Sequence, residues 1–318
     1  MNSFDILKDE EKLISEKQIK ELRRVVKGNI LINQSMREYT SLRVGGPADV
    51  IVFPEDTDDV TRTIKYLNGE RLPYFILGNG TNLLVRDGGI RTVVISLSDG
   101  FRHIVKVGGG QSKLLFAEAF APLVSLVRLS IDCGLSGLEF AAGIPGTVGG
   151  GLVMNAGGSL GELKDVTLLM TILNRTGGIS VKRREDSDFS YRNLRLASGS
   201  IILSAIFRLK PDNKSHISER VQAILGRRKE TQPLDLPNAG SIFKNPKGVP
   251  AGKLIDEAGL KGMRIGGAKV SERHGNFILN LGNATASDVL GLMKEIRDSV
   301  YRETGLVLEP EVKIIGEE

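Results

Sequence analysis

The sequence lacks several features that mark particular classes of protein. Its 318 residues include one cysteine, Cys133, three histidines and no tryptophan. A single cysteine excludes an internal disulfide, and with so few histidines we expect no metal site. No apolar run approaches the roughly 18 residues that a membrane-spanning helix needs, and no secretory signal precedes the first helix. We therefore expect a cytoplasmic protein without a membrane span.

The common nucleotide-binding motifs are also missing. Neither G-x-G-x-x-G nor G-x-x-x-x-G-K-[ST] occurs, so neither a Rossmann dinucleotide site nor a P-loop is indicated. The net charge of +5 and the pI near 9.2 favour anionic partners. However, the basic residues form no long block, and aromatic residues make up 5% of the chain, which argues against nucleic-acid binding. A solvated surface explains the basic clusters best, and phosphates on a small ligand are the next explanation.

Hydrophobic periodicity predicts an N-terminal helical segment and three α/β units. Their expected bounds are 1–29, 30–98, 99–212 and 213–318. A helix is expected after Asp56 or Thr57, a second over 114–134 with an interruption at Pro122, and a linker over 211–218. The last helix should run between Thr285 and Gly305, with Asp288 completing a capping box, and a strand should follow over 306–315.

Glycine is concentrated in one short stretch. The segment "GIPGTVGGGLVMNAGG" (143–158) holds seven glycines and one proline in sixteen residues, although glycine costs more backbone entropy on folding than any other residue. A second glycine turn, "LGNGTN" (77–82), directly follows an expected strand and could form an anion-binding nest. Each is more often an ordinary turn when it occurs alone. Two of them in one region favour a long ligand with two phosphates lying between them.

The C-terminal third contains two further polar motifs. "NAGSIFKNP" (238–246) supplies a hydroxyl, a cation and two amides, although a polar loop that leads into a strand would look the same. "EPEV" (309–312) predicts that Glu309 and Glu311 share one face of a strand, for which an exposed edge strand is the alternative explanation.

These motifs, in this order, resemble one family, the UDP-N-acetylenolpyruvoylglucosamine reductases. The segments that carry the resemblance are "YTSLRVGGPA", "LGNGTNLLVRDGGIR", "GLSGLEFAAGIPGTVGGGLVMNAG", "FSYRNL", "PNAGSIFKNP", "AGKLIDEAGLKGMRIGGAKVSERHGNFILN" and "LEPEVKIIG". The resemblance implies an α+β fold, with a vanillyl-alcohol-oxidase-type (PCMH-type) FAD-binding region of two αβ subdomains and a C-terminal αβ substrate-binding domain. It also implies FAD as cofactor and NADPH as co-substrate. The expected reaction reduces UDP-N-acetylglucosamine enolpyruvate to UDP-N-acetylmuramate for peptidoglycan synthesis.

The resemblance also assigns residues. Catalytic roles fall to Arg192 as the carboxylate ligand, Ser241 as the proton donor and Glu311 as a carboxyl group held neutral. The UDP-sugar is expected at Asn245, Lys261, His274 and Asn276, with Arg228 and Lys229 as further candidates near the diphosphate. The FAD contacts are expected at Arg43, Gly45, Gly78, Asn79, Gly80, Thr81, Asn82, Leu83, Gly143, Ile144, Pro145, Gly146, Val148, Gly149 and Asn155.

Some features depart from the family pattern. "GGSLGE" follows "NAG" where relatives usually carry an aromatic residue or histidine, and the region from Gln111 to Cys133 is longer than usual. Only ten residues separate Arg192 from Leu203, so the tyrosine-bearing lid of longer relatives is expected to be absent. Two rival interpretations remain: an FAD-dependent oxidase of a small alcohol or sugar on the same fold, and a basic binding protein without enzymatic activity.

Overall fold

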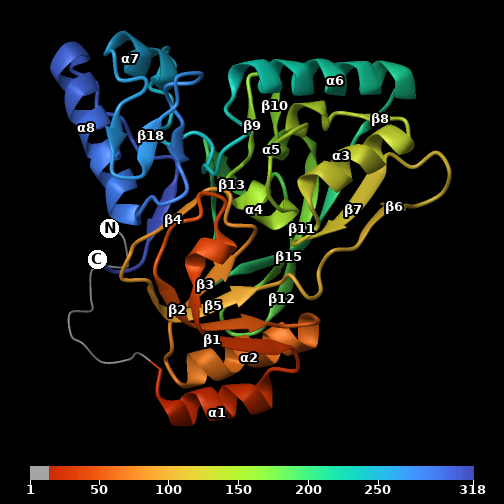
Figure 1. The fold of residues 1–318 in the computed structure, drawn as a ribbon. Helices are drawn as coiled ribbons and strands as arrows, with labels where there is room; N and C mark the ends of the chain where they lie inside the picture. Colours follow the sequence, from red (N-terminus) through yellow and green to blue (C-terminus); the bar gives the residue numbers. More distant parts are fainter. Residues whose placement is uncertain (1–13) are drawn as a thin grey trace.

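The computed structural model describes residues 14–318 (Figure 1). Residues 1–13 of the predicted N-terminal helical segment lie outside the described residues. The helix within that segment, α1 (Glu16–Val25), begins at Ser15, whose hydroxyl accepts the N–H of Gln18 in a capping box. Among the described residues, no helix has both the length and the apolar character needed to cross a membrane.

The first unit is a four-stranded mixed sheet with the two α-helices Glu16–Val25 and Thr57–Gly69 packed on one face. The strand order is β1-β2-β5-β3; β1 and β2 are antiparallel, whereas β2, β5 and β3 are parallel. Asp56 caps α2 by accepting the N–H of Asp59, as predicted. The elements are β1 (Asn29–Ser35), η1 (Met36–Tyr39), β2 (Pro47–Phe53), α2 (Thr57–Gly69), β3 (Tyr74–Leu77), β4 (Leu83–Val85) and β5 (Ile90–Ser96).

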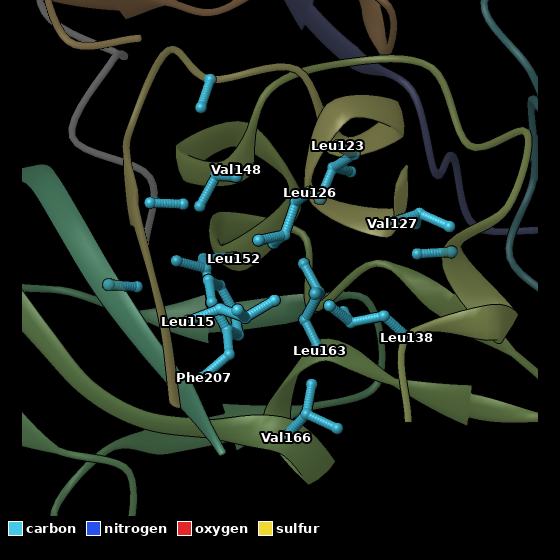
Figure 2. Packing of buried hydrophobic residues seen from close by; sticks show 14 of the residues in the cluster. Leu115, Leu123, Leu126, Val127, Leu138, Val148, Leu152, Leu163, Val166 and Phe207 are labelled. Carbon is cyan, nitrogen blue, oxygen red and sulfur yellow. The ribbon is translucent and has the colours of Figure 1, made fainter. Parts of the chain in front are cut away.

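The second unit is a five-stranded antiparallel sheet, ordered β12-β11-β15-β7-β6, whose core lies under α3, α4 and α5 (Figure 2). Leu115 and Phe207 contribute from the strands, and Leu123, Leu152 and Leu163 from the helices. The elements are β6 (Ile104–Val107), β7 (Leu114–Glu118), α3 (Leu123–Asp132), β8 (Leu135–Ser136), η2 (Glu139–Ala141), α4 (Val148–Val153), β9 (Gly157–Gly158), β10 (Gly161–Glu162), α5 (Leu163–Val166), β11 (Thr167–Leu173), β12 (Ile179–Arg183), β13 (Asp188–Ser190), β14 (Asn193–Arg195), β15 (Ile201–Arg208) and β16 (Lys210–Pro211).

Two sequence predictions for this unit are wrong. The helix expected over 114–134 is a strand followed by a helix: β7 pairs with β15 and β6, and α3 begins only after Pro122, its N-cap. The linker expected over 211–218 is mostly helix, because α6 (Lys214–Thr231) begins at once, with Asn213 as its N-cap. In α6, Val221 packs into the second core and Arg220 pairs with Glu139. The division of the chain at 29/30, 98/99 and 212/213 stays a prediction.

The third unit places α7 and α8 against a small antiparallel sheet, β17-β18-β19. The predicted last helix is confirmed, including the capping box of Thr285 with Asp288 and the left-handed Gly305 at its end. Its predicted apolar face is buried throughout: Val289, Leu292, Met293, Ile296 and Val300. The elements are α7 (Ala251–Glu257), β17 (Arg264–Ile265), β18 (Ala268–Val270), β19 (Ile278–Asn280), α8 (Ala286–Thr304) and β20 (Lys313–Ile315).

The first and third units are joined by a shared core. Leu42, Val44 and Leu84 of the first unit belong to the same buried cluster as Ile242 and Phe243 of the third. Strand β20 adds to β4 in parallel, so the C-terminal segment becomes part of the first unit. In Figure 1 the chain accordingly returns at its C-terminus from the blue third unit toward the red and orange first unit.

A carboxylate of the first unit caps the last helix. Asp87 accepts the backbone N–H groups of Ala286 (2.8 Å) and Ser287 (2.8 Å), and also the Ser287 hydroxyl (2.7 Å). Burial alone would raise the pKa of Asp87, but these hydrogen bonds outweigh it and lower the pKa below its ordinary value. Asp87 therefore stabilises the fold fully at pH values above its ordinary pKa. This contribution is lost as the pH falls through the lowered pKa of the folded protein.

We expect Asp87→Ala to destabilise the protein by about 1 kcal/mol at neutral pH, the usual effect of losing a helix cap. The difference in stability between the two proteins should shrink in acid. There Asp87 of the parent protein is protonated and no longer stabilises the helix as a carboxylate. Urea unfolding at several pH values measures both effects. Asp186→Ala is the matched control, because Asp186 is exposed and forms no ion pair within residues 14–318. An equal loss in both variants would contradict the assigned role.

Candidate active site

The two glycine turns of the sequence lie against each other. The Thr81 hydroxyl donates to the Pro145 carbonyl over 3.3 Å. A Cβ placed on Gly78 would lie 3.1 Å from Thr147 Oγ1, and one on Gly146 would lie 3.0 Å from Thr81 Oγ1. The structure therefore brings 78–82, from the end of β3, next to 143–149, at the start of α4.

The first turn has free hydrogen-bond donors. The N–H groups of Asn79, Gly80 and Thr81 donate to no protein acceptor within residues 14–318, while the Gly80 carbonyl accepts from Ser41 N (3.2 Å). Gly80 has φ +61, a left-handed conformation that suits a backbone nest. Such a turn can bind a phosphate or pyrophosphate through its backbone.

The second turn offers fewer backbone donors than the sequence suggested. The N–H groups of Ile144, Val148 and Gly149 already donate to the carbonyls of Ala141 (3.0 Å), Ala121 (2.9 Å) and Ala119 (2.8 Å). These three residues could contact a cofactor only through other atoms. The short helix α4 that follows is capped by the Thr147 hydroxyl, which accepts Gly150 N–H at 3.2 Å.

Not every glycine of the two turns is explained by a ligand. A Cβ on Gly80 would lie 2.0 Å from the Tyr39 carbonyl oxygen, and one on Gly149 would lie 3.0 Å from the Ala119 Cβ. The protein itself excludes a side chain at Gly80 and leaves little room for one at Gly149. At Gly78 and Gly146 the nearest atoms belong to the opposing turn, so an added methyl group would enter the space between the turns.

This difference predicts that Gly78→Ala and Gly80→Ala behave differently. Gly80→Ala should destabilise the apoprotein by about 1–3 kcal/mol, the usual cost of overpacking. Gly78→Ala should change stability by less than about 1 kcal/mol, because only the Thr147 hydroxyl must move, but it should weaken FAD binding. Urea unfolding and a fluorescence titration with FAD measure the two effects. Undiminished FAD binding by Gly78→Ala would exclude a cofactor between the turns.

Other predicted cofactor contacts have structural roles. The buried Asn155 donates to Glu162 Oε2 (2.9 Å) and to the Ser190 carbonyl (3.0 Å), and its side-chain oxygen accepts Lys164 N–H (3.1 Å), so its amide is fully used by the protein. Leu83 opens β4 and packs in a core. Arg43 (φ +54) and Gly45 (φ +120) form the turn before β2, where a Cβ on Gly45 would clash with Val85.

The side chains of Arg192 and Glu311 lie against each other, one from the second unit and one from the third. Arg192 lies at the turn between β13 and β14, with φ +55, and its Nε is 2.9 Å from Glu311 Oε1. The Nε–H bond does not point at this carboxyl oxygen closely enough to form a hydrogen bond. Nη1 is also buried without a hydrogen-bond partner within the described residues. The guanidinium also lies over the Tyr191 ring, 5.2 Å from its centroid. Arg192 therefore keeps donors for an anionic ligand.

The segment that carries Glu311 runs antiparallel to the one that carries Ser241. Glu311 N donates to the Ile242 carbonyl (2.7 Å) and Lys244 N to the Glu309 carbonyl (2.8 Å), with an isolated bridge between Phe243 and Pro310. Ser241 and Glu311 thus come from adjacent points of two paired segments.

The predicted strand over 306–315 is wrong for most of its length, because only β20 is a strand. Pro310 cannot donate to a ladder, so pairing around it is limited to the isolated bridge. Glu309 and Glu311 consequently do not share one face. Glu309 is 72% exposed and pairs with Lys244 (3.2 Å), whereas Glu311 is 15% exposed and pairs with Arg192.

Burial raises the pKa of Glu311 above its ordinary value, although Arg192 and Lys244 act to lower it. The direction of this shift agrees with the prediction of a carboxyl group that keeps its proton.

Arg228, near the end of α6, contacts the glycine-rich turn. Its Nη1 donates to the Gly143 carbonyl at 2.6 Å, and burial and the nearby Arg192 lower its pKa. The end of α6 thereby anchors the glycine-rich turn, a role that the sequence did not reveal.

A cleft of about 330 Å³ opens beside Ser241. It brings together the four predicted substrate ligands, Asn245, Lys261, His274 and Asn276, with Ser241. Three further charged residues line it that were not predicted, because no local motif distinguishes them from surface charges: Lys253, Asp256 and Arg273.

The cleft residues differ in what they can offer a ligand. The Lys261 ammonium pairs with Asp256 (2.6 Å). Burial lowers the pKa of His274, and the positive charge of Lys261 lowers it further. His274 Nδ1 accepts the N–H of Asn276 (3.2 Å), so in the neutral ring the proton is on Nε2. Asn276 is buried and its side-chain amide bonds both N–H and C=O of Phe243 (2.9 and 2.8 Å), which supports the segment after Ser241.

An FAD molecule fits this arrangement. The unpaired N–H groups of the first turn suit a pyrophosphate, and a Cβ on Gly78 or Gly146 would meet only one threonine hydroxyl within 4 Å, so the backbone there can be approached closely by a ligand. Arg192, with a buried unpaired donor, contacts Glu311, whose backbone bonds both to Asn82 of the first turn and to Ile242 beside Ser241.

Comparisons with known proteins agree with this geometry. Residues 48–181 match a family profile described as an FAD-binding domain, and residues 232–315 match the C-terminal domain of UDP-N-acetylenolpyruvoylglucosamine reductase. The reductases of that name from Syntrophus aciditrophicus and Geobacter metallireducens are 45% and 48% identical to this chain. The alignments cover 94% and 93% of this chain and 96% and 97% of the relatives.

A solved structure is also similar, that of the UDP-N-acetylenolpyruvylglucosamine reductase from Thermus caldophilus. It is 37% identical, with a TM-score of 0.77, and the match covers 91% of this chain and 98% of that one. The predicted α+β fold, with an FAD-binding region followed by a C-terminal αβ domain, is confirmed.

Proposed function

This chain belongs to the family of UDP-N-acetylenolpyruvoylglucosamine reductases and is a flavin-dependent oxidoreductase, and we propose that it reduces UDP-N-acetylglucosamine enolpyruvate to UDP-N-acetylmuramate with NADPH. By this proposal it acts in the cytoplasm and supplies peptidoglycan synthesis. The observation that carries the proposal is the set of contacts of Glu311: its side chain meets Arg192, its N–H bonds to Ile242 beside Ser241 of the polar cleft, and its carbonyl bonds to Asn82 of the first glycine turn.

The cofactor would be held by the paired turns. Asn79, Gly80 and Thr81 offer backbone N–H groups to the pyrophosphate, and Gly78 and Gly146 carry no side chain that would keep the cofactor from the backbone. Bound FAD would accept hydride from NADPH and deliver it to the methylene carbon of the enolpyruvyl group.

Arg192 would stabilise the charge that develops on the substrate. When the methylene carbon gains hydride, negative charge spreads from the neighbouring carbon into the carboxylate. A guanidinium can bind that carboxylate with two parallel hydrogen bonds, and its donors are already desolvated here. Such charge stabilisation is commonly the largest catalytic contribution, with one well-placed donor worth roughly 3–4 kcal/mol.

Ser241 would protonate the carbon next to the carboxylate and complete the lactyl group. A serine hydroxyl is a weak acid, but the anion formed on the substrate is a strong base, so the transfer is feasible. The serine then regains a proton from solvent. Hydride from NADPH and this proton together account for the two hydrogens added to the double bond.

Glu311 would donate a hydrogen bond to the same anion while it is protonated. Because burial raises its pKa, Glu311 is protonated below the raised value and loses its proton as the pH rises through it. We expect the rate of substrate reduction to fall on the alkaline side of the profile, and Glu311→Gln to lack that fall because its amide cannot ionise. Rapid-mixing measurements of substrate reduction against pH test this. The same alkaline fall in both proteins would assign it to another group.

The cleft would bind the UDP-sugar. Lys261 supplies positive charge for the diphosphate, neutral His274 supplies an Nε2–H donor, and Asn245 supplies amide hydrogens while its oxygen accepts Ala251 N–H. Asn276 would support the cleft indirectly, because its side-chain amide is already hydrogen-bonded to the backbone of Phe243.

Product analysis tests the proposal. The FAD-loaded protein is incubated with NADPH and UDP-N-acetylglucosamine enolpyruvate without oxygen, and the sugar nucleotide is examined by mass spectrometry. We expect it to gain two hydrogens as NADPH is consumed. UDP-N-acetylglucosamine, which lacks the double bond, is the control and should remain unchanged. NADPH consumption that requires oxygen and leaves the enolpyruvate intact would favour an oxidase.

A further inference from the structure

The side chain of Asn82 connects the cofactor turn to the segment that carries Glu311. Asn82 Nδ2 donates to the Glu311 carbonyl over 3.1 Å, and the Asn82 carbonyl accepts Lys313 N–H over 3.0 Å. The first of these contacts joins residues that lie 229 positions apart. The contacts extend into the parallel pairing of Leu83 with Lys313, where β4 and β20 begin.

Both peptide groups flanking the Glu311 Cα are thereby fixed. Its N–H donates to the Ile242 carbonyl next to Ser241, and its own carbonyl accepts the Asn82 amide and no other donor within residues 14–318. The following residue, Val312, is buried in the core shared by the first and third units. With its backbone held on both sides, Glu311 has its side chain directed to Arg192.

The same amide also touches the second unit. Asn82 Nδ2 is 3.4 Å from the sulfur of Met154, the residue that ends α4 after the glycine-rich turn. One side chain thus contacts the C-terminal segment of the third unit and α4 of the second, while its backbone belongs to the cofactor turn of the first.

We propose that Asn82 is a positioning residue for the reduction of the substrate: by holding the Glu311 carbonyl it sets the place of the Glu311 carboxyl group relative to Ser241. This inference rests on the proposed function, because it assigns the same reaction to Glu311. It goes beyond the expectation that Asn82 only contacts FAD.

Half-reaction kinetics distinguish the two roles. The FAD-loaded Asn82→Ala variant is first reduced with NADPH and then mixed with UDP-N-acetylglucosamine enolpyruvate, both without oxygen. We expect the FAD content, and the rate at which NADPH reduces and so bleaches the flavin, to stay within about threefold of the parent protein. The rate of recolouring, in which the substrate reoxidises the flavin, should fall about tenfold, the effect of one lost hydrogen bond. Loss of FAD, or an equal fall in both rates, would overturn the proposal.

Two further variants sharpen the result. Asn82→Asp keeps the size of the side chain but sets an acceptor against the Glu311 carbonyl, so recolouring should slow at least as much as in Asn82→Ala. Parent-like recolouring by Asn82→Asp would show that the donated hydrogen bond is not needed. Asn79→Ala lies in the same turn but removes no bond to Glu311, so it should not separate the two rates.

A double-variant cycle gives a readout that a purely structural role would not change. In a Glu311→Gln background, adding Asn82→Ala should slow recolouring by less than about threefold, because both changes act on the same group. A full tenfold additional effect would contradict the proposal. If the parent protein itself fails to recolour with the substrate, the proposed function is wrong; a parent that recolours while Asn82→Ala recolours equally fast refutes this inference alone.

Discussion

Replacing Ser241 with alanine is expected to abolish most of the reduction of the sugar nucleotide while leaving reduction of the flavin by NADPH intact. The hydroxyl is half-buried at the mouth of the cleft, beside the segment that carries Glu311. Without it, the carbon next to the carboxylate has no proton donor at hand. A positioned proton donor is typically worth about 10²–10⁴-fold, and we expect recolouring to slow by that factor.

Two comparisons make the Ser241→Ala result specific. Ser187→Ala removes a hydroxyl that donates only to the Arg183 carbonyl in the turn after β12, and both half-reactions should be unchanged. Reduction of Ser241→Ala by NADPH at the parent rate would show that FAD is bound normally. If Ser241→Ala recoloured as fast as the parent protein, the proton would have to come from another group.

The second large effect is expected for Arg192→Lys. A lysine keeps the charge beside Glu311 but not the planar pair of donors, so the substrate carboxylate would lose its bidentate contact. We expect the rate of substrate reduction to fall about 10²–10³-fold, comparable to the loss of one oxyanion donor. Rapid-mixing absorbance measurements of recolouring give this factor directly.

The same hairpin supplies the control for Arg192→Lys. Arg195 also lies on it, but it is 81% exposed and pairs with Asp188 on the surface over 3.4 Å, so Arg195→Lys should leave both half-reactions unchanged. Parent-like recolouring by Arg192→Lys would mean that charge alone suffices and that the forked contact plays no part.

Local signals in the sequence predicted local structure well. Thr285, Asp288 and Gly305 mark the ends of α8, because caps and left-handed turns depend on residues close in the chain. The segment before Pro122 was misassigned for the opposite reason. "LLFAEAF" has good helix formers, but pairing with β15 and β6 makes it a strand, and those partners lie elsewhere in the sequence.

The functions of the amide side chains were equally hidden. Asn82, Asn155 and Asn276 were all predicted to contact ligands, yet each side chain bonds to the protein backbone at a distance along the chain. An amide that binds a ligand and one that supports a loop look alike in a sequence. The glycines pose the same problem: a Cβ on Gly80 would clash with the Tyr39 carbonyl, whereas one on Gly78 would meet only the Thr147 hydroxyl.

The most direct test of the account is an anaerobic absorbance titration of the FAD-loaded protein. NADPH is added until the yellow colour is bleached, and UDP-N-acetylglucosamine enolpyruvate is then added in equal amount to the flavin. We predict that the colour returns fully without oxygen, because the reduced protein passes its electrons to the enolpyruvyl group. A protein that stays bleached with the sugar nucleotide and recolours only in air would contradict the account.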